Sequence, residues 1–585
     1  MDIKSVSNTP IQNVKSIQNK RERIIDNGLK ADTISFTGSI TPTDKMQVYA
    51  TTLLEKSGLK QDQPVYIEAD SKYLPFMNVL AQEAYKKGSG YVKIVAKEPE
   101  LEKLKEKYNI TAKFDYQKEE EKEFANALKF NFNDENNPYK NSGLKNNEIK
   151  SEIEKIYPPI PKIIRNQFKI KPEEIFKTAL DIHEGEPVLI NGEREHLPFI
   201  VNMVDYLYSK NKTELVDVKF NDENIVLDKN LLLYGKDELL EQVPQSRVNA
   251  DKEYYEKDVA RLFLDGDDPS RLDGVDSKRI VKRSLAFSEA RKKYRSLEQA
   301  HNPWLVYYAP TTKSCKDVYK EHNNTLTALN HAYMDANKIN RIGKLEEHVA
   351  TLKSRADKMN KLMKDGYRTL HYVSVDPETK KPDGKTDFKI TMSDRSVFKA
   401  AREEMKRFNH NVIMNLPTEE IFTSPLRNSA QGKVSATMPF SLNGKLVDGI
   451  ELTFKDGKVV NVKASQNEDM LKEHIKSHKN ADMLGEVALV AGSPIAQTGR
   501  LFNSVLLDEN AACHLALGDA YPDCVEGAMD IEDYDEQQKF LDEQNINSST
   551  THNDFMVGGP NVYIYAEHVK TGKQIPVIQD DKFLL

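Results

Sequence analysis

The chain has 585 residues, which is longer than a single hydrophobic core usually reaches, so we expect two to four domains. Charged residues make up 30% of the sequence and hydrophobic residues 38%, a polar composition that still suffices for globular cores. The formal net charge of −7 excludes a global basic field, so we expect no nucleic-acid partner.

Cysteine usage and hydropathy indicate a reducing compartment. The chain contains three cysteines, Cys315, Cys513 and Cys524, and none of them is part of a C-x-x-C motif, so a disulfide scaffold is not expected. The first 30 residues lack the apolar region of a signal peptide, and no run of 18 apolar residues occurs. We therefore expect a cytoplasmic protein with no membrane segment.

The N-terminal part of the sequence predicts an extension followed by an α/β module. Residues 1–43 are rich in Ser, Thr, Asn and Lys without a sustained hydrophobic period, which is typical of a flexible extension. Residues 44–110 then alternate helix and strand patterns, through DKMQVYATTLLEKSGL, QPVYIEA, LPFMNVLAQEAYKKG and YVKIVAK. A helix between two strands predicts a module with a parallel sheet.

The same pattern recurs 123 residues later. A proline, an L-P-F triplet and a tyrosine keep this offset, in the pairs Pro64 and Pro187, Leu74 to Phe76 and Leu197 to Phe199, and Tyr85 and Tyr208. An ungapped match of this length predicts a tandem duplication. Two similar α/β units without a common origin are the alternative. Residues 173–409 would hold the second module and the rest of the N-terminal α/β region, and the polar residues 111–172 an inserted helix and linker.

The remaining sequence predicts more helices and then a change to β structure. ARLFLDG and PWLVYYAP are strand-like, and residues 275–302 are helix-rich. After Ile342, apolar residues recur every three or four positions and predict one buried helix face: Leu345, Val349, Leu352, Ala356, Met359 and Met363. Residues 410–585 are expected to form a mainly β, α+β domain, because the turn dipeptides NG and DG separate alternating runs in SATMPFSLNGKLVDGIELTFKDGKVVNVKAS.

Ionisable residues interrupt apolar runs at four places in this C-terminal region, and a buried charge is costly unless it is paired or bound to a metal. They are Glu419 and Glu420 in NLPTEEIFTSP, Glu486 in ADMLGEVALV, Asp508, Glu509, His514 and Tyr521 in LLDENAACHLALGDAYP, and His552 and Asp554 in TTHNDFMV. Each place also has a purely structural interpretation: a helical turn capped by Thr418, a Glu486 paired with a core arginine, an interior His514, and a common H-x-D pair.

Periodicity brings these residues together. If TTHNDFMV is a strand, His552 and Asp554 face the same way. If AACHLALGDAY is a helix, His514 and Tyr521 lie two turns apart on one stripe, with Glu509 at the helix entrance. The mixture of nitrogen and oxygen ligands suits Zn²⁺, Co²⁺ or Mn²⁺, and the number of candidate ligands favours two ions over one.

Five ordered blocks carry a family resemblance: NLPTEEIFTSP, NGKLVDGIELTFKDGKVV, LGEVALV, SPIAQTGRLFNSVLLDENAACHLALGDAYP and THNDFMVGG. They resemble the thermophilic metallo-aminopeptidases, the family of aminopeptidase T and aminopeptidase S, and the likeness is continuous from about residue 410 onward. The resemblance implies two divalent metal ions (Zn, Co or Mn), together with the family's tyrosine at Tyr521. The ligands that it implies are Glu420, Glu486, Glu509, His514, His552 and Asp554. The module occurs once in the family and twice here, but no ligand is missing.

The resemblance implies a metal-dependent aminopeptidase that removes the N-terminal residue of short peptides by means of a metal-activated water. We expect Glu419 to be the general base because it lies beside Glu420, and Tyr521 to bind a metal or to donate to the oxyanion. Family members are dimers, so we expect a homodimer. The alternative is a non-catalytic metal-binding or interaction protein on the same fold. A cysteine hydrolase is disfavoured, because the neighbours Cys513 and His514 cannot easily present their side chains to each other.

Overall fold

The computed structural model describes residues 41–585 except 222–227, 269, 317, 342, 406, 408, 443–444, 503 and 532. Most of the expected N-terminal extension therefore lies outside the described residues. The chain divides into two compact units. Their described parts are 41–106, 119–159 and 228–240 for unit 1, and 107–118, 160–221 and 241–585 for unit 2. Among the helices of these parts, none has the length and apolar character needed to cross a membrane.

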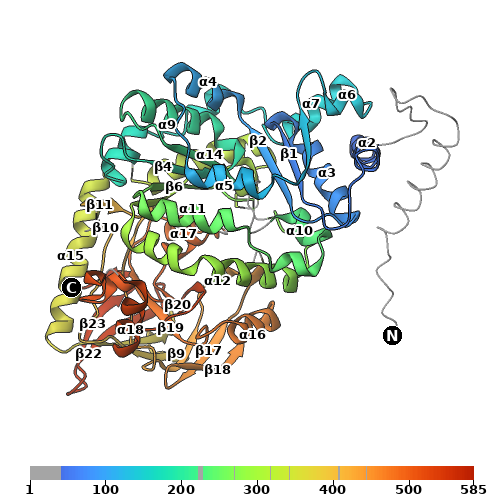
Figure 1. The fold of residues 1–585 in the computed structure, drawn as a ribbon. Coiled ribbons are helices and arrows are strands. Elements are labelled where there is room, and N and C mark those ends of the chain that lie inside the picture. Colours follow the sequence, from blue (N-terminus) through green and yellow to red (C-terminus); the bar gives the residue numbers. More distant parts are fainter. Residues whose placement is uncertain are drawn as a thin grey trace, which may run out of the picture. The chain divides into compact units, whose positions relative to one another are not determined.

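Unit 1 is built on a parallel sheet with the strand order β2, β1, β3 (Figure 1). β1 (Val65–Asp70) pairs with β2 (Val92–Lys97), and α3 (Leu74–Lys86) connects them. Pro75 lies in the first turn of α3, where its missing N–H costs nothing. The other elements are α2 (Pro42–Lys56), η1 (Ser71–Tyr73), β3 (Leu128–Phe132), α6 (Pro138–Asn141), α7 (Asn146–Glu154), α10 (Lys229–Tyr234) and η5 (Asp237–Leu240), while α4 (Pro99–Tyr108) and α5 (Asp115–Glu123) cross the unit boundary.

Unit 2 contains the second module. Its elements are β4 (Val188–Gly192), η3 (Arg194–His196), α9 (Leu197–Ser209) and β5 (Val216–Phe220), in the same order as β1, η1, α3 and β2. α3 and α9 both have 13 residues and both begin with L-P-F. β4 and β5 are parallel neighbours, as β1 and β2 are. The predicted tandem α/β modules with parallel sheets are therefore confirmed.

The stretch expected to be an inserted linker contributes a strand instead. β3 pairs in parallel with β1 and buries Phe130 and Phe132. Its alternating pattern spans only five residues between polar segments, which is too short to distinguish a strand from a loop by periodicity alone.

The parallel sheet of unit 2 has the order β12, β7, β6, β4, β5. β6 (Ala260–Asp265) and β7 (Trp304–Tyr308) are the strands expected in ARLFLDG and PWLVYYAP. The short strand β12 (Asn415–Leu416) pairs in parallel with β7. This pairing fixes the segment that leads to Glu420 against the α/β sheet.

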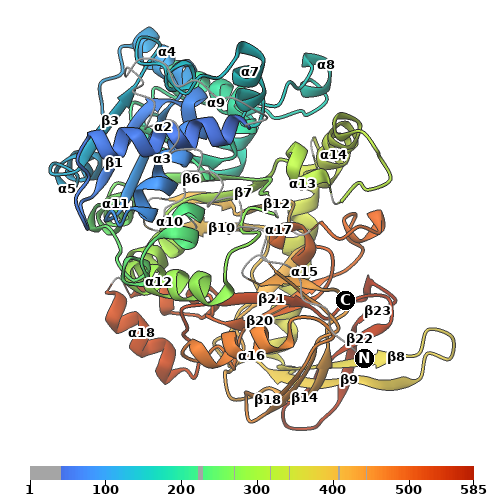
Figure 2. The same ribbon diagram turned by 90° about the vertical axis from the view of Figure 1, so that its right-hand side faces the viewer.

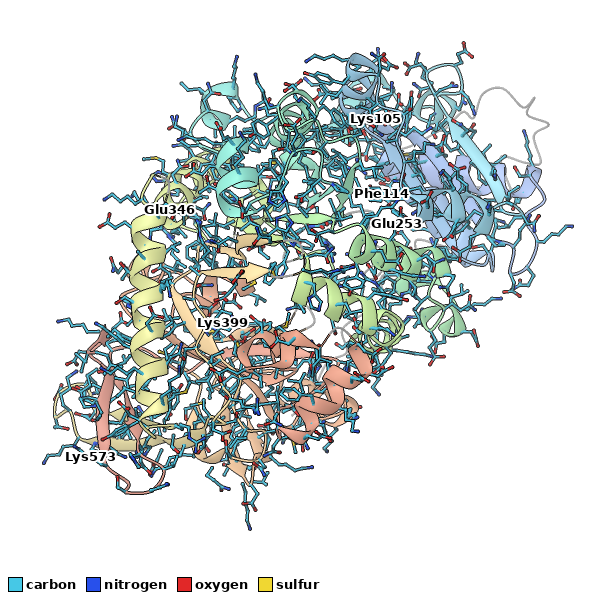
Figure 3. All side chains as sticks on the ribbon, turned by 60° about the vertical axis from the view of Figure 1, so that its left-hand side comes forward. Lys105, Phe114, Glu253, Glu346, Lys399 and Lys573 are labelled. Atoms are coloured by element: carbon cyan, nitrogen blue, oxygen red, sulfur yellow. The ribbon has the colours of Figure 1, made fainter. Side chains whose placement is uncertain are left out.

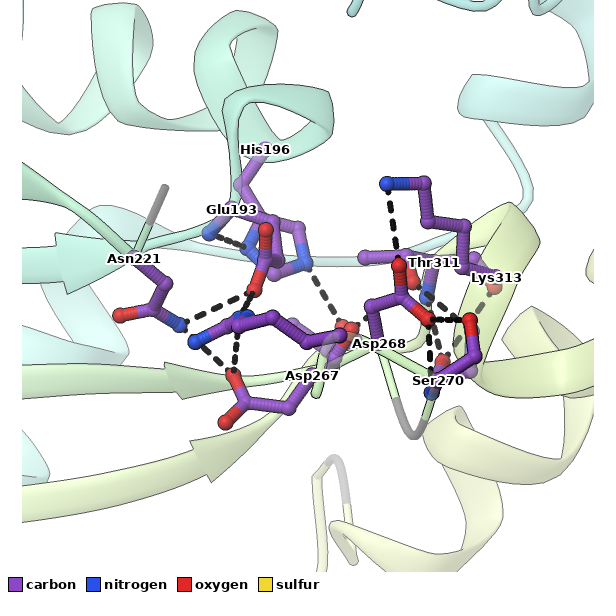
Figure 4. Close-up of polar contacts among 12 residues, drawn as sticks. Glu193, His196, Asn221, Asp267, Asp268, Ser270, Thr311 and Lys313 are labelled. Carbon is purple, nitrogen blue, oxygen red and sulfur yellow. Dashed lines mark hydrogen bonds and ion pairs between the residues drawn. The ribbon is translucent and has the colours of Figure 1, made fainter. Parts of the chain in front are cut away.

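Polar contacts connect the loops at the carboxyl ends of these strands (Figure 4). His196 Nδ1 accepts the Glu193 N–H at 3.1 Å, and His196 Nε2 donates to the Ala309 carbonyl at 2.7 Å. Glu193 also pairs with Arg271. Ligands often bind at this edge of an α/β sheet. Here His196 bonds to backbone groups and Glu193 pairs with Arg271, and these contacts hold together the loops after β4, β6 and β7.

Unit 2 also includes residues 107–118. Phe114 and Glu253 lie close together in Figure 3. Glu253 accepts the first two backbone N–H groups of α5 at 2.9 and 2.8 Å, which satisfies that helix end. Phe114 and Tyr116 are buried and make edge-to-face contacts with Tyr254, at ring-centroid distances of 5.5 and 5.6 Å. The segment is therefore part of the core of unit 2.

Helix α15 (Leu345–Lys364), the long yellow helix of Figure 1, confirms one predicted face. Its buried residues are the six expected ones, Leu345, Val349, Leu352, Ala356, Met359 and Met363. The other helical elements of unit 2 before residue 410 are α8 (Lys162–Arg165), the π-helical turn η2 (Glu174–Ala179), α11 (Gln245–Glu256), α12 (Ser277–His301), α13 (Thr312–Lys316) and α14 (Thr325–Ile339).

The C-terminal part is mainly antiparallel β structure, as predicted (Figure 2). The largest sheet contains, in spatial order, β18 (Lys458–Lys463), β17 (Glu451–Lys455), β14 (Gln431–Ser435), β9 (Pro382–Thr391), β8 (Thr369–Val375), β22 (Val562–Glu567), β23 (Gln574–Gln579) and β24 (Lys582–Phe583). Asp456 and Gly457 both have positive φ, so the DG dipeptide forms the expected tight hairpin turn. The NG dipeptide lies outside the described residues, although its flanking strands pair antiparallel.

Two small hairpins and several short helices complete this part. They are β10 (Arg402–Met405) with β11 (His410–Ile413), β15 (Phe440–Leu442) with β16 (Lys445–Val447), α16 (Glu468–Ser477), η6 (Ala496–Thr498), η7 (Pro522–Cys524), η8 (Ala528–Asp530) and α18 (Tyr534–Glu543).

Candidate metal centre

A four-stranded antiparallel sheet carries five of the six candidate ligands. Its strands, in spatial order, are β13 (Glu420–Thr423), β19 (Leu484–Val490), β20 (His514–Gly518) and β21 (His552–Met556). The register places Glu486 opposite Ala516 and Ala516 opposite Asp554. Residues that lie opposite each other, or two apart on a strand, share a face of the sheet. The residues on this one face include Glu420, Glu486, His514, His552 and Asp554.

The expected helix in AACHLALGDAY is wrong, because the structure has β20 there. All five residues of β20 are buried, and β19 and β21 pair with it on both sides. A short run that is buried on both faces shows no alternation, so periodicity does not distinguish it from a buried helix. His514 and Tyr521 consequently do not share a helical stripe.

Small residues on the ligand face of β20 escaped the sequence reasoning. Ala516 lies between Glu486 and Asp554, and Gly518 lies opposite His552. Gly518 has φ of +113°, and a Cβ there would come within 1.9 Å of a backbone oxygen of Thr551. Reading HLALG as a strand would have placed these small residues beside the ligands.

The six side chains contain two overlapping groups that share Glu486. Glu420, Glu486 and His514 form one group, and Glu486, His552 and Asp554 form the other. In each group the candidate ligand atoms lie within 4.8 Å of one another. The shortest contacts join His514 Nε2 to Glu420 Oε2 at 3.0 Å and His552 Nε2 to Glu486 Oε2 at 2.9 Å. A shared carboxylate between two groups suits a pair of neighbouring cations.

Backbone carbonyls fix the orientation of both imidazoles. His514 Nδ1 lies 3.1 Å from the Ala512 carbonyl, and His552 Nδ1 lies 2.8 Å from the Asp519 carbonyl. A carbonyl only accepts, so we assign the proton to Nδ1 in each ring. Nε2 of each ring then faces the carboxylates, as is common for metal-binding histidines. Sequence reasoning could not identify these partners, because backbone groups leave no mark in the residue type.

The donor set fits divalent cations. Glu420 Oε2 and Asp554 Oδ1 are buried and make no well-aligned hydrogen bond among the described residues, and their nearest partners are the imidazoles of His514, at 3.0 Å, and His552, at 3.4 Å. Burial, and then the Asp554 charge, raise the pKa of Glu486 to about 7. Burial alone would lower the pKa of His514, but Glu420, Glu486 and Asp554 outweigh it and raise that pKa well above its usual range. Without metal, protons must partly neutralise the buried carboxylates, and cations would replace them.

Glu509, the sixth candidate ligand, lies at the end of α17 (Val505–Glu509) instead of at a helix entrance. Ser504 caps this helix and hydrogen-bonds Asp265, at the end of β6, so the parallel sheet anchors it. Burial raises the pKa of Glu509 well above its usual range, and the charges of Asp554 and Glu420 add to the effect. The carboxylate therefore senses the same charges as the other candidate ligands.

Tyr521 also faces this group. Its hydroxyl lies 3.4 Å from His552 Nε2, and its ring lies 4.9 Å from the His552 ring. Burial, followed by the charge of Glu486, raises the pKa of Tyr521 well above its usual range, so the hydroxyl stays protonated. The neutral hydroxyl can donate a hydrogen bond at this position.

The geometry does not support Glu419 as a base that contacts this group. Its carboxylate accepts hydrogen bonds from Arg341 at 2.7, 2.8 and 3.0 Å, and it lies 3.5 Å from His348 Nε2. Successive residues of an extended chain face opposite ways, and Glu420 takes the ligand face. The structure also has no helical turn capped by Thr418 there, because β13 begins at Glu420.

A cavity of about 820 Å³ opens over the ligand face. Its wall includes five candidate ligands and the tyrosine, namely Glu420, Glu486, Glu509, His514, His552 and Tyr521. Further acidic side chains of the wall are Glu403, Glu404, Asp519, Asp523, Glu526 and Asp530. Glu419 is not among the residues that line this cavity. The arrangement can hold two cations at the wall of a space large enough for a small ligand.

Cys513 lies on the other side of the sheet. Its Sγ donates to the Val490 carbonyl at 3.1 Å and accepts the Val490 N–H at 3.2 Å. Burial raises the pKa of the Cys513 thiol to about 12, so the reactive thiolate is scarce. These contacts give no support to a cysteine nucleophile.

Similar proteins share the region that carries this centre. The profile of a family described as thermophilic metalloprotease (M29) matches residues 172–583. Aminopeptidase AmpS from Bacillus subtilis (strain 168) is 29% identical over 408 residues, covering 69% of this chain and 95% of AmpS. Aminopeptidase 2 from Geobacillus stearothermophilus is 30% identical over 412 residues, covering 69% of this chain and 94% of that protein. The solved structure of wild-type AmpT from Thermus thermophilus has a TM-score of 0.62 and 24% identity, covering 72% of this chain and 99% of that chain.

Proposed function

The chain belongs to the thermophilic metalloprotease family (M29) and is accordingly a metallo-aminopeptidase, and we propose that it removes the N-terminal residue of short peptides with the help of two divalent metal ions. The observation that carries this proposal is the convergence of three carboxylates and two imidazoles at one wall of a cavity, with Asp554 grouped beside Glu486 and His552. A non-catalytic protein would have no need to place such a costly group of buried charges beside an open cavity.

The residues that would hold the two ions are Glu420, Glu486, Glu509, His514, His552 and Asp554, and Glu486 belongs to both groups of candidate ligands. When bound, such ions lower the pKa of a coordinated water and polarise the substrate carbonyl. Zn²⁺, Co²⁺ and Mn²⁺ all accept this mixture of imidazole and carboxylate ligands.

The chain supplies the remaining groups. Tyr521 lies in the cavity wall, 3.4 Å from His552 Nε2, and its hydroxyl donates a hydrogen bond to the developing oxyanion or binds a metal. Acidic side chains of the wall, such as Glu404 and Glu526, attract the positively charged α-amine of a peptide. The Glu419 side chain points away from the ligand face and pairs with Arg341. This pair holds the backbone at Glu419 and thereby positions the next residue, Glu420.

The size of the cavity supports short peptides as substrates. A volume of about 820 Å³ falls in the range of small-molecule pockets, roughly 300 to 1,000 Å³. A folded protein does not enter such a space. We also propose a homodimer, as the family resemblance implies, and a cytoplasmic location, which the buried free cysteines Cys315, Cys513 and Cys524 support.

The test is metal-dependent release of N-terminal residues. The purified full-length protein is stripped with a chelator, reloaded with Zn²⁺, Co²⁺ or Mn²⁺, and assayed on an aminoacyl chromophore and on a dipeptide to decapeptide series. We expect no turnover after chelation, recovery on reloading, and no release from peptides with a blocked α-amine. Full turnover after exhaustive chelation would contradict the proposal, and equal turnover on blocked peptides would contradict exopeptidase action.

A further inference from the structure

A second group of metal-type side chains lies in unit 2, apart from the candidate metal centre. His183, Glu186 and His410 each offer a ligand atom within 4.8 Å of the others. Asp258 adds a carboxylate oxygen at 2.9 Å from His410 Nε2. We propose that these four side chains bind one divalent cation of the zinc class as a structural site.

The four residues come from three segments that the fold brings together. His183 and Glu186 lie in the loop between η2 and β4, Asp258 lies between α11 and β6, and His410 opens β11. The loop is held from outside the group, because the Asn211 side chain donates to the His183 carbonyl at 2.9 Å. The donors are therefore placed by the surrounding backbone before any cation binds.

In each of the two residues at the centre, a backbone group holds one polar atom and the other polar atom faces the rest of the group. His410 Nδ1 lies 2.9 Å from the Asp181 carbonyl, so Nε2 faces the carboxylates, as in His514 and His552. Glu186 Oε2 accepts the His183 N–H at 2.7 Å, which leaves Oε1 toward the two imidazoles. Glu186 Oε1 lies 2.8 Å from His183 Nδ1 and 3.5 Å from His410 Nε2.

An unpaired buried oxygen points independently to a missing ligand. Asp258 is 5% exposed, and its Oδ1 has no hydrogen-bond partner among the described residues. Asp258 Oδ2 makes the His410 contact. Leaving Oδ1 unpaired is costly, and a cation held by both oxygens of this carboxylate would satisfy it. The side of the group that carries His183 is open to solvent, because the His183 side chain is 52% exposed. An ion can enter from this side.

Three contacts among the four side chains are close to the ligand spacing of a zinc site. Zinc bonds of about 2.0 to 2.2 Å place neighbouring ligand atoms roughly 3.3 to 3.5 Å apart. The contact of 3.5 Å already has that spacing, and the side chains at 2.8 and 2.9 Å would have to move apart slightly to admit an ion. Two imidazole nitrogens and two carboxylate oxygens favour Zn²⁺ or Co²⁺ over the oxygen-preferring Mg²⁺ and Ca²⁺.

A cation here would stabilise a wall of the cavity. His410 begins β11, which pairs with β10, and Glu403 and Met405 of β10 line the cavity. Tyr255, three residues before Asp258, lines it as well. Clamping these segments together would make the cavity wall resist local unfolding.

The test counts zinc in matched variants of the full-length protein. His183→Ala and Glu186→Gln remove one proposed ligand each, while Glu184→Gln changes an exposed carboxylate of the same loop that pairs with Lys212. After loading with ZnCl₂ and exhaustive dialysis, elemental analysis should give one zinc fewer per chain in both ligand variants and no change in Glu184→Gln. Calorimetric titration should show that one class of site weakens on the order of tenfold or more. Zn²⁺ should also raise the thermal midpoint of the wild type more than that of His183→Ala.

The comparison does not depend on aminopeptidase activity, because only the difference between variants is counted. In a Glu486→Gln background, which weakens the candidate metal centre, His183→Ala should still remove one further zinc. Equal zinc content in the wild type, His183→Ala and Glu186→Gln would overturn the proposal, and the group would then be an ion-paired hydrogen-bond network. Equal loss in Glu184→Gln would also overturn it, because the effect would then belong to the loop and not to the ligands.

Discussion

Glu419→Gln distinguishes a base from a positioning residue. The Glu419 carboxylate is almost fully buried and is bound by the Arg341 guanidinium, whose side chain is 28% exposed. Burial raises the pKa of Glu419 to about 7, with the charge of Arg341 opposing that rise. The carboxylate therefore depends on Arg341 to stay charged near neutral pH, and the two residues should behave as a pair.

The magnitude follows from breaking this pair. Removing one partner of a buried ion pair costs about 3–5 kcal/mol, because the other charge stays buried. Arg341 is partly exposed, and a glutamine oxygen can still accept one of its N–H groups, so we expect a smaller loss of stability than this, about 2–3 kcal/mol. The altered backbone at Glu420 should also weaken metal binding. At saturating metal, turnover should fall by less than about tenfold, since no group in the cavity is lost.

The assay measures thermal midpoint, metal affinity and turnover at saturating metal in Glu419→Gln, Arg341→Met and the double variant. A positioning pair predicts that each single variant loses stability and that the double variant recovers part of the loss. A general base predicts a different result: both metals and the midpoint retained, with turnover lower by roughly 10²–10⁴. That second result would refute the positioning role and show that the carboxylate leaves Arg341 during catalysis.

Three further predictions follow from the fold and the site. Because Glu486 belongs to both groups of candidate ligands, Glu486→Gln should lower the affinity for both metal ions by roughly 10², about 3 kcal/mol per ligand. Glu420→Gln should lower the affinity for mainly one of them. A calorimetric titration in which the two variants behave alike would contradict the sharing of Glu486. Burial lowers the pKa of His196 to about 4 from 6.5, so the neutral ring stabilises the fold above pH 6.5 and up to about 3 kcal/mol is lost as the pH falls from 6.5 to 4. The thermal midpoint of His196→Gln should accordingly depend less on pH in this window, and an unchanged slope would show that other groups control it. Phe114→Ala should destabilise unit 2 by about 3–5 kcal/mol and so lower the temperature at which aminopeptidase activity is lost. Phe124 is a matched buried phenylalanine of unit 1, and Phe124→Ala should leave that temperature unchanged. An equal fall in both variants would mean that the two units unfold together.

Local patterns predicted those parts of the fold in which one face is buried. The stripe from Leu345 to Met363 recurs every three or four residues, and the structure buries the predicted side of α15. The strand containing His552 and Asp554 also formed, and both side chains reach Glu486. In each case the sequence period itself records which side chains share a face.

The features that the sequence analysis predicted wrongly, or did not predict, depend on contacts between residues that are distant in the sequence. β20 is central in its sheet, so both of its faces are apolar, and only its pairing with β19 and β21 identifies it as a strand. Arg341 lies 78 residues before Glu419, so no local pattern joins them. The backbone carbonyls that orient His514 and His552 likewise follow from the fold and not from residue type. The candidate ligands could be proposed from the sequence because ordered blocks carry them, whereas the backbone groups that orient their side chains could not.

The boundary between the units shows why domain limits are hard to predict from sequence. Composition and polarity made residues 111–172 look like an insertion, and the family match begins only at residue 172. Yet Phe114 and Tyr116 are buried in a core cluster of unit 2 with Leu189, Ala250, Tyr254 and Val259. Glu253 accepts the backbone N–H groups at the start of α5, so the contact is polar as well as apolar. When a chain leaves a unit and later returns to it, residues from both segments are buried in the same core. The segment 107–118 therefore stabilises the unit that holds the candidate metal centre, although it lies outside the region matched by the family profile.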